Sequence, residues 1–129
     1  MKFAAFGRTQ WLFDSIQAAI REGHQVVLIG TSAPAPEYTV NESDFARLAD
    51  EQGCAYFCDS LINRPKYVQL ISATGAEVAI SVNWPTIIEK TIFDQFHYGV
   101  INAHAGDLPR FRGNAVPNWA ILKGEKKVV

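Results

Sequence analysis

The stretch KFAAFGRTQWLFDSIQAAIREGHQVVLIGT, residues 2–31, decides the fold class of this chain. It opens with a short apolar run that Gly7 ends, and it closes with an uninterrupted apolar run at residues 25–31. Such runs are typical of strands that are buried on both faces of a parallel sheet. Between them, apolar residues recur at helical spacing and include Trp11, and Gly23 stops the helix in the C′ position. Strand, helix and strand in about thirty residues predict a βαβ unit.

The rest of the chain repeats this alternation. Further strands are predicted at residues 54–58, 76–82 and 99–104, and further helices at residues 41–53, 64–75, 85–96 and 115–125. Strands that alternate with helices predict an α/β fold, a Rossmann-like and mostly parallel sheet flanked by helices. No internal repeat or low-complexity linker interrupts the pattern, so a single domain is expected.

Composition and charge exclude several classes of protein. The chain has 129 residues, 48% of them hydrophobic, and a net charge of −1, which is globular composition without a global attraction to nucleic acid or membranes. No apolar run approaches the length of a membrane span or of a signal peptide, so a reducing cytoplasm is the expected location. Cys54 and Cys58, the only two cysteines, make a poor zinc site, and no metal is expected.

The densest group of chemically capable side chains lies in VINAHAGDLPRFRGNAVPNWAIL, residues 100–122. Asn102 and His104 are two apart at the end of a predicted strand, so they project to the same side. A carboxamide can donate to a developing oxyanion, and an imidazole can exchange protons near neutral pH. The pair therefore suits addition of a nucleophile to a carbonyl-like carbon, although the N-x-H pattern alone is equally compatible with a structural role.

Dinucleotide and P-loop cofactors are disfavoured by the first strand-to-helix turn. FGRTQ contains a lone glycine and neither of the glycine-rich phosphate-binding patterns. Arg8 in this turn is equally compatible with an anion site at the following helix and with a solvated loop residue.

The segment INAHAGDLPRFRGNAVPNWAILKGE resembles the hallmark segment of the formyltransferases that depend on 10-formyltetrahydrofolate. In that family a strand-end Asn-x-His precedes a Leu-Pro-x-x-x-Gly loop and a helix, and all three features fall in register here. The resemblance implies formyl transfer from 10-formyltetrahydrofolate, a folate co-substrate, to a primary amine. The resemblance extends to individual residues from about Ser81 onward. Before Ser81, only the order of the predicted strands and helices agrees with the family.

Carried over residue by residue, the resemblance gives each matching position a role. Asn102 resembles the asparagine that polarises the formyl oxygen, and His104 resembles the histidine that stabilises the tetrahedral intermediate. The positions that resemble folate contacts are Trp84, Thr86, Ile87 and Ile88 after the fourth strand, and Leu108 in the loop. The positions expected to contact the acceptor are Arg110, Arg112 and Asn114.

Two departures from the family pattern limit the resemblance. Asp107 replaces a leucine of the usual Ser-Leu-Leu-Pro loop, so it is expected to shape the loop or meet the acceptor rather than take a proton. The family's catalytic aspartate belongs to a loop beyond residue 129. We therefore expect residues 1–129 to form an incomplete N-terminal formyltransferase domain, truncated at its C-terminus and inactive or badly impaired by itself.

Several acceptors and functions remain open at the level of sequence. NWAILKGE resembles the enzymes that formylate nucleotide-linked amino sugars, so a small or nucleotide-linked amine is the favoured acceptor, with methionyl-tRNA as the alternative. The other candidates are a folate-binding module without catalysis, the related hydrolase that transfers the formyl group to water, and a Rossmann domain that binds NAD. Binding of a folate analogue or of NAD would separate the family interpretation from the last of these.

Overall fold

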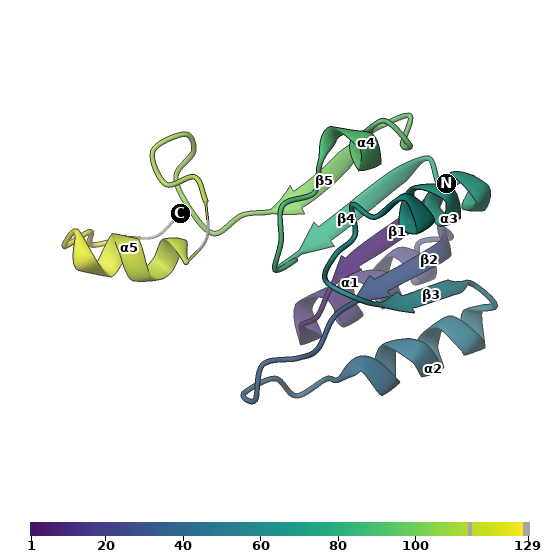
Figure 1. Cartoon of the computed structure of the whole chain (residues 1–129). Coiled ribbons are helices and arrows are strands. Elements are labelled where there is room, and N and C mark those ends of the chain that lie inside the picture. The colour runs from purple at the N-terminus through teal and green to yellow at the C-terminus, as the bar shows by residue number, and fades with distance from the viewer. Residues whose placement is uncertain (114, 128–129) are drawn as a thin grey trace.

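The computed structural model describes residues 1–113 and 115–127 and contains one five-stranded sheet (Figure 1). The strands lie in the order β3-β2-β1-β4-β5, and every neighbouring pair is parallel. Their bounds are β1 Lys2–Gly7, β2 Gln25–Thr31, β3 Ala55–Cys58, β4 Val78–Val82 and β5 Val100–Ala103. This confirms the predicted α/β class and the parallel βαβ unit at the N-terminus.

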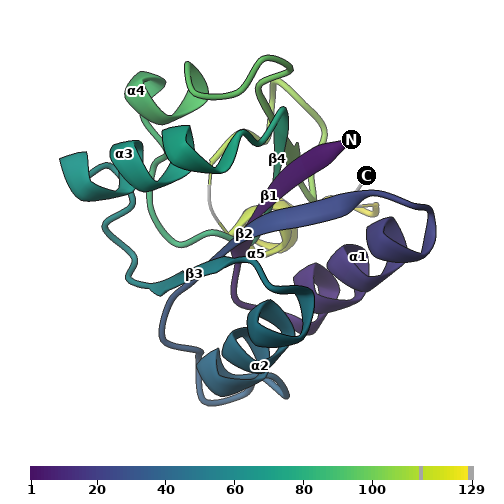
Figure 2. The same cartoon turned by 90° about the vertical axis from the view of Figure 1, so that its right-hand side faces the viewer.

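Helices cover both faces of the sheet (Figure 2). Their bounds are α1 Gln10–Arg21, α2 Glu42–Gln52, α3 Pro65–Thr74, α4 Lys90–Phe93 and α5 Val116–Leu122. The first two pack on one face and the next two on the other, and each layer encloses its own cluster of buried apolar residues. The fifth helix lies beyond the carboxyl end of β5, away from both layers (Figure 1).

The central strand β1 shows why both faces must be covered. Phe3 and Ala5 belong to the cluster under α1 and α2, whereas Ala4 and Phe6 belong to the cluster under α3 and α4. Successive side chains of a strand point to opposite faces, so an uninterrupted apolar run supplies both layers at once. All four side chains are buried.

An aromatic cluster fills the layer between the sheet and α3 and α4. The ring centroid of Phe6 lies 6.3 Å from that of Phe57, 6.0 Å from that of Trp84 and 6.1 Å from that of Phe96. Gly30 on β2 makes room for this arrangement, because a Cβ atom there would lie 2.4 Å from Cζ of Phe57 and 2.9 Å from Cδ1 of Phe6.

Substitution Gly30→Ala is therefore expected to destabilise the chain by about 1–3 kcal/mol, the usual cost of overpacking a core. Urea unfolding followed by far-UV circular dichroism measures this cost as a lower midpoint. The double variant Gly30→Ala with Phe57→Leu is the control, because the smaller side chain leaves space for the added methyl. A double variant no more stable than Gly30→Ala would contradict the steric explanation.

Helix α1 departs from the sequence prediction at one apolar position. Leu12 and Ile16 are fully buried against the sheet, whereas the side chain of Trp11 is 73% exposed. Residues one apart on a helix lie about a quarter-turn or more from one another, so the first turn cannot bury both Trp11 and Leu12 against one flat sheet. The expectations for α2 and α3 are confirmed, since Asn41 caps α2 in a capping box and Pro65 opens α3.

The helix predicted at residues 85–96 is shorter than expected and begins only at Lys90. The carboxamide of Asn63, from the loop before α3, holds the preceding backbone in a non-helical path. Its Nδ2 donates to the carbonyl of Ile87 at 2.8 Å, and its Oδ1 accepts from the amide of Glu89 at 2.9 Å. The Asn63 side chain thus provides hydrogen-bond partners for two backbone groups just before α4 that have no partner within the helix.

Candidate active site

The two halves of the sheet diverge at β1, which pairs with β2 on one side and β4 on the other. Ligands of open α/β sheets bind outside the carboxyl ends of the strands at such a switch point. The turn after β1 therefore borders the cleft together with the segments after β4 and β5. The sequence analysis placed candidate site residues in the last two of these segments, and the structure adds the turn after β1.

Asn102 and His104 stand at the carboxyl end of β5. Asn102 is the third residue of the strand and pairs in register with Ser81 of β4. Both residues line the same two hollows. The nitrogen donor of a carboxamide and an imidazole thus lie together at the boundary between two cavities.

One of these cavities, which we call the Phe93 hollow, has a volume of about 340 Å³. Besides the pair, it is lined by Ser81, Trp84, Thr86, Ile88, Phe93, Val100 and Gly113. The lining combines aromatic and aliphatic side chains with hydroxyl, amide and imidazole groups, and such a mixture can both enclose and orient a small organic ligand.

The second cavity, the Pro117 hollow, has a volume of about 430 Å³ and shares Trp84, Asn102, His104 and Gly113 with the first. Its other lining residues are Trp11, Val82, Asn83, Ala103, Ala105, Ala115, Val116 and Pro117. Two adjoining hollows thus border the pair, as a reaction between two substrates requires.

The imidazole of His104 is held by the loop that follows it. Its Nε2 lies 2.6 Å from the backbone oxygen of Phe111, so this nitrogen carries the proton and donates it to the carbonyl. The amide of Phe111 in turn donates to the backbone oxygen of Asp107 at 2.8 Å. The loop thus fixes the tautomer and the orientation of the ring.

A hydrogen-bond chain fixes the segment that follows β4. The indole Nε1 of Trp84 donates to Oγ1 of Thr86 at 3.0 Å, and that hydroxyl donates to the backbone oxygen of Ser60 at 2.7 Å. The loop containing Ser60 is anchored by Asp59. Hydrogen bonds from the backbone amide of Leu61 and from the Tyr67 hydroxyl lower the pKa of the Asp59 carboxyl.

Trp84, Thr86 and Ile88 line the Phe93 hollow, but the remaining described residues of the prediction line neither hollow. The side chain of Ile87 is 81% exposed and that of Leu108 is 60% exposed, and neither lines the Phe93 or the Pro117 hollow. Arg112 lies farther along the loop beside Trp119 and Lys123. Asn114 lies outside the described residues.

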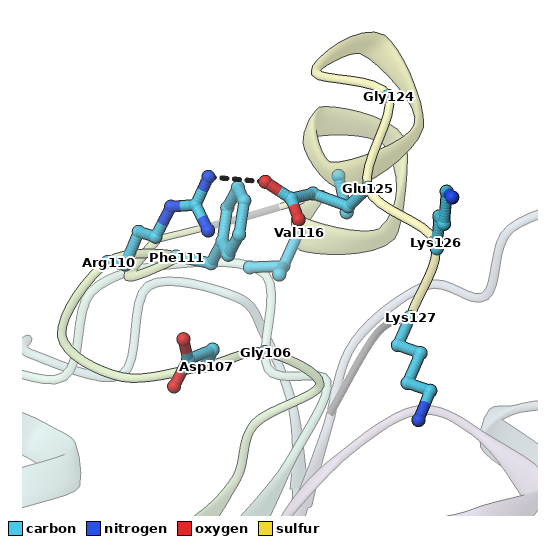
Figure 3. A pocket seen from close by; sticks show the side chains of 10 residues that line it. Gly106, Asp107, Arg110, Phe111, Val116, Gly124, Glu125, Lys126 and Lys127 are labelled. Atoms are coloured by element: carbon cyan, nitrogen blue, oxygen red, sulfur yellow. Dashed lines mark hydrogen bonds and ion pairs between the residues drawn. The ribbon is translucent and has the colours of Figure 1, made fainter.

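A separate hollow of about 440 Å³ collects Asp107 and Arg110 (Figure 3). There the guanidinium of Arg110 forms an ion pair with Glu125, and it lies 4.8 Å from the ring centroid of Phe111. This hollow contains neither Asn102 nor His104, so the structure does not assemble an Asn, His and Asp set. Asp107 instead shapes the loop through its backbone oxygen.

Sequence reasoning missed Trp11, Asn83, Ser81 and Phe93 as residues of the site. Asn83 had a visible signal, because it follows a strand directly in the SVNWPT stretch. The other three carried apolar or small side chains that the strand and helix patterns already explained.

Among residues 1–113 and 115–127, no group of three or more His, Cys, Asp or Glu side chains is placed to hold a metal. None of the helices in the same ranges is long and apolar enough to cross a membrane.

Comparison with known proteins identifies the family. A family model described as formyl transferase matches residues 1–128. The chain belongs to the formyl transferase family. The match spans all five strands of this formyl transferase chain and the strand-end residues Asn102 and His104.

Curated relatives match the formyl transferase chain along almost its whole length. A methionyl-tRNA formyltransferase of Agathobacter rectalis is 28% identical over 129 residues, which cover 98% of this chain and 42% of the relative. A methionyl-tRNA formyltransferase of Methylobacterium sp. (strain 4-46) is 30% identical over 128 residues, which cover 97% of this chain and 41% of the relative. The chain thus spans about two fifths of the length of these relatives.

Solved structures share the fold of the formyl transferase chain at lower sequence identity. A phosphoribosylglycinamide formyltransferase of Bacillus halodurans matches with a TM-score of 0.74 and 16% identity, covering 99% of this chain and 68% of that one. A sugar N-formyltransferase of a Shewanella species matches with a TM-score of 0.67 and 17% identity, covering 99% of this chain and 48% of that one. The sheet and its helices are thus common to members that differ in the named acceptor.

Proposed function

We propose that this chain carries the formyl-transfer centre of an enzyme that moves a formyl group from 10-formyltetrahydrofolate to a primary amine. One observation carries the proposal: Asn102 and His104 both line two adjoining hollows. In this proposal the folate occupies the Phe93 hollow, and the amine enters from the Pro117 hollow. Both substrates then meet at the carboxamide and the imidazole.

The chemistry follows from the side chains at this meeting point. The nitrogen of the amine attacks the formyl carbon, a C–N bond forms, and the π electrons of the C=O bond move onto oxygen. Nδ2 of Asn102 and an N–H of His104 donate hydrogen bonds to this oxyanion. The carbonyl re-forms as the bond to N10 of the folate breaks. One proton passes from the attacking nitrogen to N10, and formylated amine and tetrahydrofolate result.

His104 must change partners to take part in this step. Its Nε2–H is bound to the backbone oxygen of Phe111. We infer that the loop from Ala105 to Gly113 shifts when substrates bind, which turns the imidazole donor toward the oxyanion. Hydrogen bonds of a catalytic group are often misaligned in a free enzyme and tighten in the complex.

A folate analogue tests the proposed place of the co-substrate. A stable 10-formyl folate analogue is expected to bind the chain in a calorimetric titration, and NAD is not. Phe93→Ala is expected to weaken binding about tenfold, because the 41% exposed ring lines the hollow. Ile87→Ala is the matched control, since its exposed side chain does not line the hollow and binding should stay within about twofold.

Two outcomes would overturn this placement. Binding of NAD without binding of the folate analogue would reject the proposed co-substrate. A larger loss for Ile87→Ala than for Phe93→Ala would place the folate on the outer side of the segment after β4, as the family resemblance alone suggests. A chain that binds the analogue but does not transfer the formyl group when supplied with amines would be the folate-binding module.

Two classes of acceptor are supported by different observations. The loop arginines Arg110 and Arg112 and the NWAILKGE segment favour a small or nucleotide-linked amine, with Arg110, Arg112 and Asn114 as the proposed contacts. The names of the curated relatives favour methionyl-tRNA. Protein expressed from its own gene, supplied with methionyl-tRNA or with a nucleotide-linked amino sugar, separates the two by mass analysis of the formylated product.

A further inference from the structure

A third hollow continues the cleft on the side of β1 and β2. This Tyr38 hollow has a volume of about 300 Å³ and is lined by Thr9, Gln10, Trp11, Glu37, Tyr38, Thr39 and Asn83. Trp11 and Asn83 also line the Pro117 hollow, which contains Asn102 and His104. The two hollows therefore share a wall, and a ligand of nucleotide size can extend from one into the other.

The aromatic ring of Tyr38 is held in place by residues from two other parts of the chain. Its hydroxyl accepts a hydrogen bond from Nδ2 of Asn83 at 2.9 Å, and the Arg8 guanidinium carbon lies 5.5 Å from the ring centroid. Arg8 is itself fixed, because it donates to the backbone oxygen of Ala33 at 3.2 Å. The loop between β2 and α2 thus presents a preorganised ring to the cleft.

Trp11 presents a second ring to this cavity, on the side of α1 that cannot pack against the sheet. Its side chain is 73% exposed, while Leu12 and Ile16 of the same helix fill the core. Among the described residues it forms no pair with another aromatic ring and no cation–π contact. Exposed tryptophan beside a cavity is a common anchor of recognition, because its large flat surface gains most from being covered.

Thr9 contributes a polar group to the lining of the Tyr38 hollow. Its Oγ1 is buried and makes no hydrogen bond within the described part of the chain. Buried polar groups in native proteins normally have partners, so this hydroxyl retains an unused donor and acceptor at a residue that borders the cavity.

We propose that the Tyr38 hollow is a nucleobase subsite, in which a planar base of the formyl acceptor stacks on Trp11 beside the ring of Tyr38. The inference rests on the proposed function, because it assumes that the acceptor enters from this side of Asn102 and His104. Base and aromatic rings stack strongly and with little dependence on the base. The base belongs either to a nucleotide-linked amine or to the terminal adenosine of an aminoacyl-tRNA, and the recognition chemistry is the same.

The subsite is tested by nuclear magnetic resonance on the chain labelled with ¹⁵N. The sequence contains three tryptophans, Trp11, Trp84 and Trp119, which give three indole signals. Titration with UMP or with the trinucleotide CpCpA is expected to shift the Trp11 indole in a saturable way. Ribose 5-phosphate, which has no base, is expected to leave that signal in place.

Variants separate stacking from general binding to the surface. Trp11→Ala and Tyr38→Ala are each expected to weaken nucleotide binding about tenfold. Tyr98→Ala is the matched control, because this ring is also exposed but lines neither the Tyr38 nor the Pro117 hollow, and its removal should leave binding unchanged. Trp11 and Tyr98 are both exposed, so neither change is expected to prevent folding.

The outcomes identify the source of the base, and they test the nucleobase subsite separately from the proposed formyl transfer. Tighter binding of CpCpA than of UMP assigns the base to a tRNA end, and the reverse assigns it to a nucleotide-linked amine. Equal binding by the wild-type chain and Trp11→Ala, or equal affinity for ribose 5-phosphate, would overturn the subsite. Nucleotide binding through Trp11 by a chain that does not bind the folate analogue would keep the subsite and reject formyl transfer.

Discussion

Replacing Asn102 by alanine is expected to lower the rate of formyl transfer by a factor of about 10²–10³ in protein expressed from its own gene. Loss of a single oxyanion donor has an effect of this size, because the donor acts on charge that develops only in the transition state. The rate is measured as formylated amine formed under saturating folate co-substrate. Binding of the folate analogue is expected to stay within about threefold, since the Phe93 hollow keeps most of its lining.

Two further variants sharpen this result. Asn102→Asp keeps the shape of the side chain but loses the amide donor, so it is expected to be as slow as Asn102→Ala. Ile101→Ala is the matched control, because this neighbouring side chain points to the opposite side of β5 and is 63% exposed. A rate for Asn102→Ala above half that of the unmodified protein would reject the role proposed for the carboxamide.

Replacing Phe6 by alanine is expected to destabilise the chain by about 3–5 kcal/mol, the cost of emptying a large site in a core. Its side chain is fully buried, and its ring contacts those of Phe57, Trp84 and Phe96. Urea unfolding measures the loss as a lower midpoint. A small domain has a total stability of only about 5–15 kcal/mol, so a large part of the variant is expected to be unfolded in water.

Phe93→Ala is the control for this experiment. This variant also removes a phenyl ring, but the ring of Phe93 is 41% exposed and lies outside the aromatic cluster. The expected loss of stability is therefore only about 1 kcal/mol. Equal losses for the two variants would show that the cluster around Phe6 does not hold the sheet and its helices together.

The fold was predictable from the sequence wherever local pattern and tertiary packing agree. The apolar run of β1 places side chains in both layers, and the same run predicts a strand buried on both faces. Prediction and structure disagree where a residue that is distant in sequence makes the deciding contact. Asn63 holds the backbone before Lys90 out of the helix that the sequence favours, and no local window contains that contact.

The candidate site was predictable to a similar extent and for the same reason. Asn102 and His104 fall together because side chains alternate along a strand, which is a local rule. The bond between His104 and Phe111 and the meeting of Tyr38 with Asn83, 45 residues apart, depend on how loops return to the sheet. The apolar spacing of α1 includes both Trp11 and Leu12, and it does not reveal which of the two neighbours is buried against the sheet.

The indole of Trp84 belongs to two structures at once. It packs against Phe6 and Phe57 inside the molecule, and it lines both the Phe93 and the Pro117 hollows. Occupancy of either hollow and unfolding of the chain are therefore thermodynamically linked through one side chain. A ligand that binds only the native state raises the melting temperature in proportion to the logarithm of its excess over Kd. Because this indole moves from an apolar core to water on unfolding, a variant that keeps Trp84 as its sole tryptophan reports the melting transition and the ligand titration by fluorescence in the same sample.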